Sequence, residues 1–315
     1  MTDLKIGVNL WSQRTSWADF LDAAVRVDHL GYRSLWTWDH IHAIFGDPLQ
    51  DIFEAYTTLG AWAQATRQIQ IGLMVGANTF RNPGLVAKSI ATLDHISGGR
   101  AILGIGGAWF EYEHTAHGID FGTGFGQRLD WLDESVAAMT TLLTGGTVTS
   151  EPGGHYAFAD LRHNPAPLHK VPVMIGGTGR KKTLRTLARY GDMWNAFGLP
   201  AEVAELDQVL RAHCDAVGRD QSEIERTINL WIVIRDDKRE AERVWAEAMA
   251  HNDVRYEDSL EEARPILGSV EEVAARLREY TAVGFDGLIA ELPTPFDHET
   301  MERLIGEVKP LVDAD

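Results

Sequence analysis

The fold is decided by residues 171–196, which read VPVMIGGTGRKKTLRTLARYGDMWNA. A short apolar run at 171–175 leads through a glycine-rich turn into a helical pattern marked by Leu184 and Leu187, and a second short run follows at 192–196. Short runs that are apolar on both faces are typical of buried parallel strands, and parallel neighbours need a crossover between them. The stretch therefore predicts a strand, a helix and the next parallel strand.

The same unit recurs along the whole chain. Eight candidate strands alternate with helical patterns, at residues 6–10, 34–38, 69–75, 101–105, 171–175, 192–196, 228–234 and 287–292. Eight such units close into a barrel, and no linker or shift in composition divides the chain. We therefore predict an α/β protein with one domain over residues 1–315, a single (β/α)8 TIM barrel. An open doubly wound sheet is the alternative, but it would leave two sheet edges to protect.

Two insertions interrupt the repeat, one after the fourth strand and one before the fifth. Residues 107–126 and 143–170 are rich in Gly and Pro and carry scattered His and aromatic residues, so both are predicted to be long loops. Barrel enzymes build their sites from the loops that follow the strands. The first loop follows a strand directly, so we expect it to overhang the mouth of the barrel, the end at which the strands finish. The second begins at the opposite end, although its length allows it to fold back.

The amino-acid composition limits the kinds of binding partner and the cellular location that we expect for this protein. The chain has 46 acidic and 29 basic residues, a net charge of −17, which disfavours nucleic acid and anionic membranes as partners. Cys214 is the only cysteine, so no intrachain disulfide can form. No apolar run approaches the roughly 18 residues of a membrane span, and the N-terminus does not resemble a secretory signal. We expect a cytoplasmic protein, with its oligomeric state left open, a homodimer included.

Tryptophans recur where the predicted strands end. Trp11, Trp38, Trp109 and Trp194 follow or close the first, second, fourth and sixth strands. Core packing is the alternative for any one of them, because Trp is strongly buried on average. Their recurrence at one end of the barrel favours a flat apolar pocket for substrate and a fused-ring cofactor.

The glycine-rich turn after the fifth strand is a candidate phosphate cradle. Gly176, Gly177, Thr178 and Gly179 lead into a helix, and Arg180 follows them. Free backbone N–H groups at a helix start bind anions, and glycine lets the ligand approach closely. A tight turn without a ligand is the alternative reading. The turn is not a G-x-G-x-x-G motif, so it does not indicate a dinucleotide-binding Rossmann unit.

Four motifs follow one another in a fixed order. They are WDH at 38–40, TFRNP at 79–83, GIG at 104–106 followed by Glu111, Glu113 and His114, and IGGTG at 175–179 followed by DMWN at 192–195. In this order they resemble the luciferase-like monooxygenase superfamily over the whole chain. The resemblance is stronger to the branch that uses the deazaflavin coenzyme F420 than to relatives that use FMN.

The resemblance implies roles for the residues at the mouth. Asp39 would contact the polar edge of the cofactor ring, and His40 would act near the ring carbon that exchanges hydride. The peptide between Met74 and Val75 would be a cis bond in a bulge that supports the ring from behind. The segment from Gly176 to Gly179 would bind the cofactor phosphate.

Two further residues, Ala77 and Gly107, are included among the predicted cofactor-binding residues, because they follow the third and fourth strands at the same mouth. Arg180 is included as the cation beside the phosphate.

The predicted reaction is hydride transfer between F420 and an unidentified organic substrate, with His40 handling the proton. F420-dependent glucose-6-phosphate dehydrogenases place a Glu after the fourth strand as proton donor, but Trp109 stands nearest that position here. This departure puts a sugar-phosphate substrate in doubt. The alternatives are an FMN-dependent monooxygenase that uses reduced flavin and O2, and a cofactor-binding relative without turnover.

A metal-dependent amidohydrolase is the alternative from a different class, because residues 40–42 read His-Ile-His. Such a barrel also needs His ligands at the fifth and sixth strands and an Asp at the eighth. The chain offers Gly176, Asn195 and Glu291 there, so no metal site is predicted.

Overall fold

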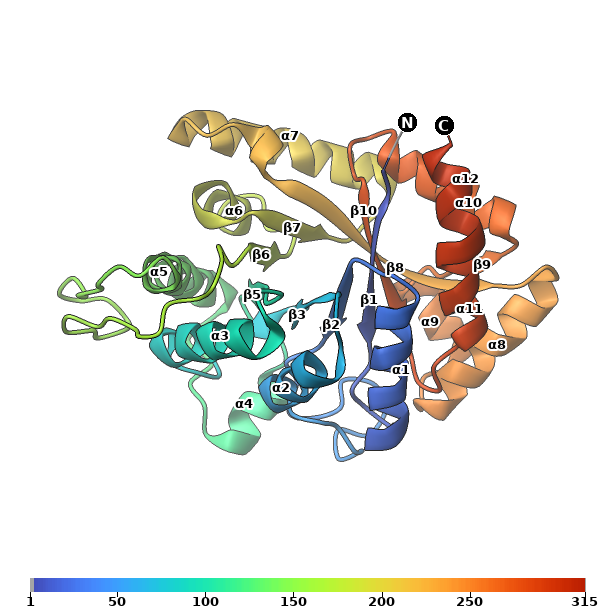
Figure 1. Ribbon diagram of the computed structural model, residues 1–315, viewed down its shortest axis with the longest axis horizontal. Coiled ribbons are helices and arrows are strands. Elements are labelled where there is room, and N and C mark those ends of the chain that lie inside the picture. The colour runs from blue at the N-terminus through green and yellow to red at the C-terminus, as the bar shows by residue number, and fades with distance from the viewer. Residues whose placement is uncertain (1–2, 315) are drawn as a thin grey trace.

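Parallel strands form a ring at the centre of the molecule, and helices surround it (Figure 1). The computed structural model describes residues 3–314. The strands are β1 (Lys5–Leu10), β2 (Ser34–Thr37), β3 (Gln70–Leu73), β4 (Gly76–Ala77), β5 (Leu103–Gly106), β6 (Val173–Gly176), β7 (Met193–Ala196), β8 (Glu225–Ile234), β9 (Ile266–Gly268) and β10 (Gly287–Leu292).

The helices that cover the ring begin with α1 after the first strand and end with α12 at the C-terminus. They are α1 (Trp17–His29), α2 (Ala55–Ala65), α3 (Pro83–Ser97), α4 (Glu111–His117), α5 (Phe125–Leu143), α6 (Thr183–Tyr190), α7 (Pro200–Val217), α8 (Lys238–His251), α9 (Tyr256–Glu262), α10 (Val270–Thr281), α11 (His298–Arg303) and α12 (Lys309–Asp313), with a 3-10 turn at Gln221–Glu223 and a π-helical stretch at Leu304–Val308. None of the helices within residues 3–314 is both long and apolar enough to cross a membrane.

The predicted barrel is confirmed. The pairing order is β3-β2-β1-β10-β8-β7-β6-β5-β4, and every pair in it is parallel. The two ends of that order, β3 and β4, are halves of one segment, and a further bridge joins Ile71 to Ala101. The third predicted strand, 69–75, is therefore corrected to two short strands, one paired on each side. β9, which was not predicted, adds to β8.

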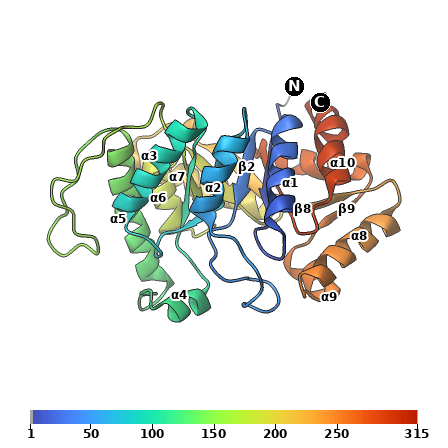
Figure 2. The ribbon, with the colours of Figure 1, turned by 60° about the horizontal axis from the view of Figure 1, so that its bottom comes forward.

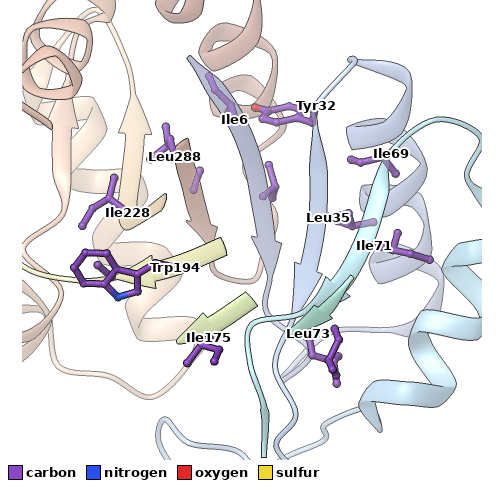
Figure 3. Packing of buried hydrophobic residues seen from close by; sticks show 14 of the residues in the cluster. Ile6, Tyr32, Leu35, Ile69, Ile71, Leu73, Ile175, Trp194, Ile228 and Leu288 are labelled. Atoms are coloured by element: carbon purple, nitrogen blue, oxygen red, sulfur yellow. The ribbon is translucent and has the colours of Figure 1, made fainter. Parts of the chain in front are cut away.

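Side chains fill both faces of the ring because each strand alternates its residues between them. Trp36, Met174, Met193 and Ile289 pack together inside the barrel. The outer layer packs against the helices, and Figure 3 shows part of it, including Ile6, Leu35, Ile71, Ile175, Trp194 and Leu288.

The insertions gather at the end where the strands finish. In Figure 2, α4, the loop after β2 and α9 lie at the end opposite the two chain termini. The predicted loop 107–126 contains α4, a correction, and α4 is held by buried His114, whose ring bonds Thr79 and the Phe110 carbonyl. The loop 143–170 does fold back, because the Tyr156 hydroxyl reaches the carbonyl of Asn78 after β4 at 3.4 Å. Residues 38–54 and the α8–α9–β9 segment are insertions that were not predicted.

Ring closure leaves no room for a side chain at Gly104. A Cβ there would lie 1.8 Å from the backbone oxygen of Leu73. Because that atom is backbone, β5 would have to separate from β3, and we expect Gly104→Ala to lower the free energy of unfolding by about 2–3 kcal/mol or more. Urea denaturation measures it. Gly60→Ala is the control, since Gly60 lies within α2 facing open space, and it should stabilise by about 0.5–1 kcal/mol. Wild-type stability of Gly104→Ala would contradict the tight closure.

Candidate active site

A cavity of about 570 Å³ opens at the mouth of the barrel. Residues from opposite sides of the ring line it, and twelve of the predicted site residues are among them: Trp38, Asp39, His40, Met74, Val75, Ala77, Gly107, Trp109, Gly176, Gly177, Thr178 and Gly179. The fold thus brings most of the predicted cofactor and substrate residues around one space.

Three predicted residues lie outside the cavity lining. Trp194 is a correction: its neighbour Asn195 faces the cavity, so Trp194 faces outward and packs against Phe285, with its indole N–H donating to the Gly177 carbonyl. Trp11 is also corrected, because it is buried behind the cavity wall, 4.6 Å from the ring of Trp38. The Arg180 side chain is exposed and paired with Glu205 at 3.1 Å.

The bulge predicted in the third strand is present between β3 and β4. The peptide between Met74 and Val75 is cis, as predicted, and both residues line the cavity. The Val75 side chain lies over two glycines: a Cβ at Gly106 would meet it at 2.6 Å and a Cβ at Gly176 at 2.9 Å. Glycine at these two positions is therefore required by the bulge itself. This is a role that the phosphate interpretation had not assigned to Gly176.

Asp39 is buried at the cavity wall and held by two donors. Its carboxylate accepts from the Ala77 backbone N–H at 2.9 Å and from the Arg81 guanidinium at 2.7 and 3.0 Å. Burial raises the pKa of Asp39, and the adjacent Arg81 opposes that rise. Arg81 also pairs with the more exposed Glu54 at 2.7 Å. Arg81 belongs to the TFRNP motif at residues 79–83, but its pairing with Asp39 was not predicted.

His40 is oriented by a buried carboxylate on α4. Its Nδ1 lies 2.8 Å from Glu113 Oε1, and the other oxygen of Glu113 accepts the Ile41 backbone N–H at 2.9 Å. An ionised carboxylate only accepts, so Nδ1 carries the proton and donates it, and Nε2 is left as the basic nitrogen. Within residues 3–314, Nε2 has no hydrogen-bond partner. The Trp109 ring lies 5.6 Å from the imidazole.

A second buried carboxyl, Glu291 on β10, lines the other side of the cavity. It accepts from Asn9 and Trp11 at 2.8 Å and from Asn229 at 3.0 Å. Burial raises the pKa of Glu291. The sequence analysis mentioned Glu291 only because it stands where a metal-dependent amidohydrolase would need an Asp ligand. The overlooked signal was a single charge within an otherwise apolar strand.

The turn after β6 presents unused backbone donors. Gly177 has a φ of +124°, which favours glycine, and its N–H is taken by the Asn195 carbonyl at 3.0 Å. The following N–H groups, of Thr178, Gly179 and Arg180, have no acceptor within the described part of the chain. They lead into α6, where the Leu184 N–H is already taken by the Gly179 carbonyl at 3.1 Å. The turn can therefore hold an anion.

The comparisons with known proteins agree with this geometry. A family model described as luciferase-like monooxygenase matches residues 4–267. An F420-dependent glucose-6-phosphate dehydrogenase of Kineococcus radiotolerans is 28% identical over 98% of this chain and 97% of its own.

Solved structures show the same fold. An F420-dependent secondary alcohol dehydrogenase in complex with an F420-acetone adduct superposes with a TM-score of 0.84 at 22% identity, covering 98% of this chain and 99% of that one. The oxygenating constituent of 3,6-diketocamphane monooxygenase from Pseudomonas putida, in complex with FMN, gives a TM-score of 0.76 at 18% identity, with 98% and 99% covered. Since the family model covers most of the sequence, the chain belongs to the luciferase-like monooxygenase family.

Proposed function

We propose that this protein is an oxidoreductase that transfers hydride between coenzyme F420 and an organic substrate. The observation that carries the proposal is the single cavity in which the Met74–Val75 bulge, the free N–H groups of Thr178 and Gly179 and the unpaired Nε2 of His40 meet. Similarity over nearly the full length to an F420-dependent dehydrogenase supports the choice of cofactor.

The residues present fit such a cofactor. The bulge offers an apolar surface for a fused ring, and the backbone of Thr178 and Gly179 offers donors for a phosphate in the same cavity. When bound, the deazaflavin would supply the hydride acceptor or donor. The protein would orient the ring through Asp39, which the Ala77 N–H holds in place, and it would exclude water with the aromatic wall.

His40 supplies the proton chemistry on this side of the cavity. With Nδ1 donating to Glu113, Nε2 can accept a proton, and the carboxylate stabilises the imidazolium that forms. The buried position of Glu113, fixed by the Ile41 N–H, holds the ring in one orientation. General acid–base assistance of this kind contributes roughly 10²–10⁴-fold to a rate.

FMN is the second candidate cofactor, because an FMN-dependent monooxygenase shares the fold. Titrating the purified protein with each cofactor, followed by absorbance and by quenching of tryptophan fluorescence, separates the two. We expect F420 to bind at least about tenfold more tightly than FMN, a difference of about 1.4 kcal/mol. Tighter binding of FMN would move the chain to the monooxygenase reading, and failure of both to bind would reject the proposed function.

A further inference from the structure

The wall of the cavity across from the bulge comes from β8 and β10. β8 lies four strands from β3 in one direction around the ring and four strands from β4 in the other, so it faces the bulge directly, and β10 is its neighbour. Asn229, Trp231 and Glu291 on these strands line the cavity. A planar ring resting on the bulge would therefore turn its free face toward them, and a substrate would lie between.

Among the carboxyl groups of the described residues that line this cavity, that of Glu291 pairs with no charged group. Four ionisable side chains line the cavity: Asp39, His40, Glu113 and Glu291. Asp39 is paired with Arg81, and Glu113 is used by His40. Glu291 receives its hydrogen bonds from neutral groups, the amides of Asn9 and Asn229 and the indoles of Trp11 and Trp38. Neither Lys nor Arg is found among the described residues that line this space.

Two unsatisfied acceptors stand beside this carboxyl. The Oδ1 atoms of Asn9 and Asn229 are buried and have no hydrogen-bond partner. Asn9 is fully buried, and Asn229 lines the cavity. A buried amide oxygen without a donor costs free energy, so the wall lacks a hydrogen. The hydroxyl of a bound molecule would supply it at Asn229. Burial raises the pKa of Glu291, and the hydrogen bonds that its carboxyl accepts oppose that rise.

The rim of the cavity selects against charge. Trp109, Phe125 and Phe197 line it and are 60%, 49% and 55% exposed, unusually open for large apolar side chains. A substrate that covers them would remove this apolar surface from water. An anionic substrate would gain no cation in the cavity and would meet the carboxyls of Asp39 and Glu113. The lining therefore suits a neutral, apolar molecule.

We propose that Glu291 is the proton carrier on the substrate side of this site, and that the site takes a neutral apolar carbonyl compound or the corresponding alcohol. The proposal rests on the proposed function. In the oxidation, the C–H bond of the alcohol carbon breaks with its electron pair going to oxidised deazaflavin as hydride. The O–H bond breaks with its proton going to the Glu291 carboxylate, and the C=O bond forms. In the reverse direction, neutral Glu291 returns the proton to the carbonyl oxygen.

The test uses protein loaded with oxidised F420 and a neutral ketone, acetophenone, with benzoate as an anionic probe of similar size. Calorimetry measures binding across pH. Neutral Glu291 donates a hydrogen bond to the ketone below its pKa and loses that donor above it. We therefore expect acetophenone binding by the wild type to weaken at least about tenfold as pH rises through that pKa, about 1.4 kcal/mol. Benzoate should bind at least about tenfold more weakly than the ketone.

Two variants show which side chain causes the pH dependence of ketone binding. Glu291→Gln keeps a donor at every pH, so its ketone binding should not change with pH. His42→Asn, which changes a histidine outside the cavity, should keep the wild-type pH dependence. Infrared difference spectra of the wild type provide a measurement that needs no stable variant, because ketone binding should shift the C=O band of a protonated carboxyl.

Titration with F420 is run first, and it tests the proposed function alone. If F420 binds, the proposal for Glu291 is overturned by ketone binding that does not change with pH, by a pH dependence that survives in Glu291→Gln, or by failure of the ketone to bind. Benzoate binding as tight as that of acetophenone would overturn the substrate class.

Discussion

Replacing Arg81 by Met should lower the free energy of unfolding by about 3–5 kcal/mol, the usual cost of leaving one member of a buried ion pair uncompensated. Asp39 is 1% exposed, and two of its three hydrogen bonds come from Arg81. Methionine preserves an apolar stem but removes the charged guanidinium, whose central carbon lies 4.7 Å from the centre of the Tyr56 ring. Only the N–H of Ala77 would remain to hold the carboxylate.

The loss should also depend on pH. Burial raises the folded-state pKa of Asp39, and removing Arg81 removes the opposing charge. A group whose pKa is raised on folding contributes stability below its unfolded pKa and loses it as pH rises through the folded pKa. Arg81→Met should therefore be closest to the wild type in acid and weakest at neutral pH. Urea unfolding at several pH values measures this.

Two variants control the argument. Glu54→Gln removes the more exposed partner of the same guanidinium, and exposed pairs contribute only about 0–1 kcal/mol. Adding Asp39→Asn to Arg81→Met replaces the stranded carboxylate by a neutral amide, and it should remove the pH dependence. An Arg81→Met protein as stable as Glu54→Gln would show that the Asp39 carboxyl is neutral and does not depend on its partner.

The barrel could be predicted because its signal is local and repeated. Each buried parallel strand, such as β6 and β7, is a short apolar run followed by a helical pattern, and eight repeats leave few alternatives. The bulge at Met74–Val75 was predicted only through the family resemblance, since residues 69–75 read as one mostly apolar strand. The α8–α9–β9 segment was missed because one more helix and strand do not disturb the pattern of alternation.

The site was predictable where its residues are neighbours in sequence and obscure where they are not. Asp39 and His40 stand side by side after β2, but Arg81 and Glu113, which hold them, lie 42 and 73 residues further on. Such pairs depend on the register of the ring and on the course of the loops, which composition does not specify. Trp194 was predicted on the wrong face of its strand, because a shift of one residue along a strand moves a side chain to the opposite face of the sheet.

His40→Asn should lower turnover by roughly 10²–10⁴-fold, the contribution expected of a positioned acid–base group. Turnover would be followed by the absorbance of F420, with whichever neutral carbonyl compound or alcohol the wild type accepts. Asparagine retains polarity but offers no basic nitrogen in place of Nε2, so it cannot accept or return a proton. Binding of F420 should stay within about twofold, since the ring support and the phosphate turn are untouched.

His42→Asn is the matched control, because it makes the same change two residues along the chain. The His42 ring bonds the carbonyl of Pro48 and does not line the cavity, so turnover should be unchanged. Glu113→Gln should give an intermediate loss with an altered pH profile: an amide can still accept from Nδ1 of His40, but it no longer stabilises the imidazolium. Equal losses for the His40 and His42 variants would mean that the imidazole at position 40 serves only to anchor α4 and takes no part in proton transfer.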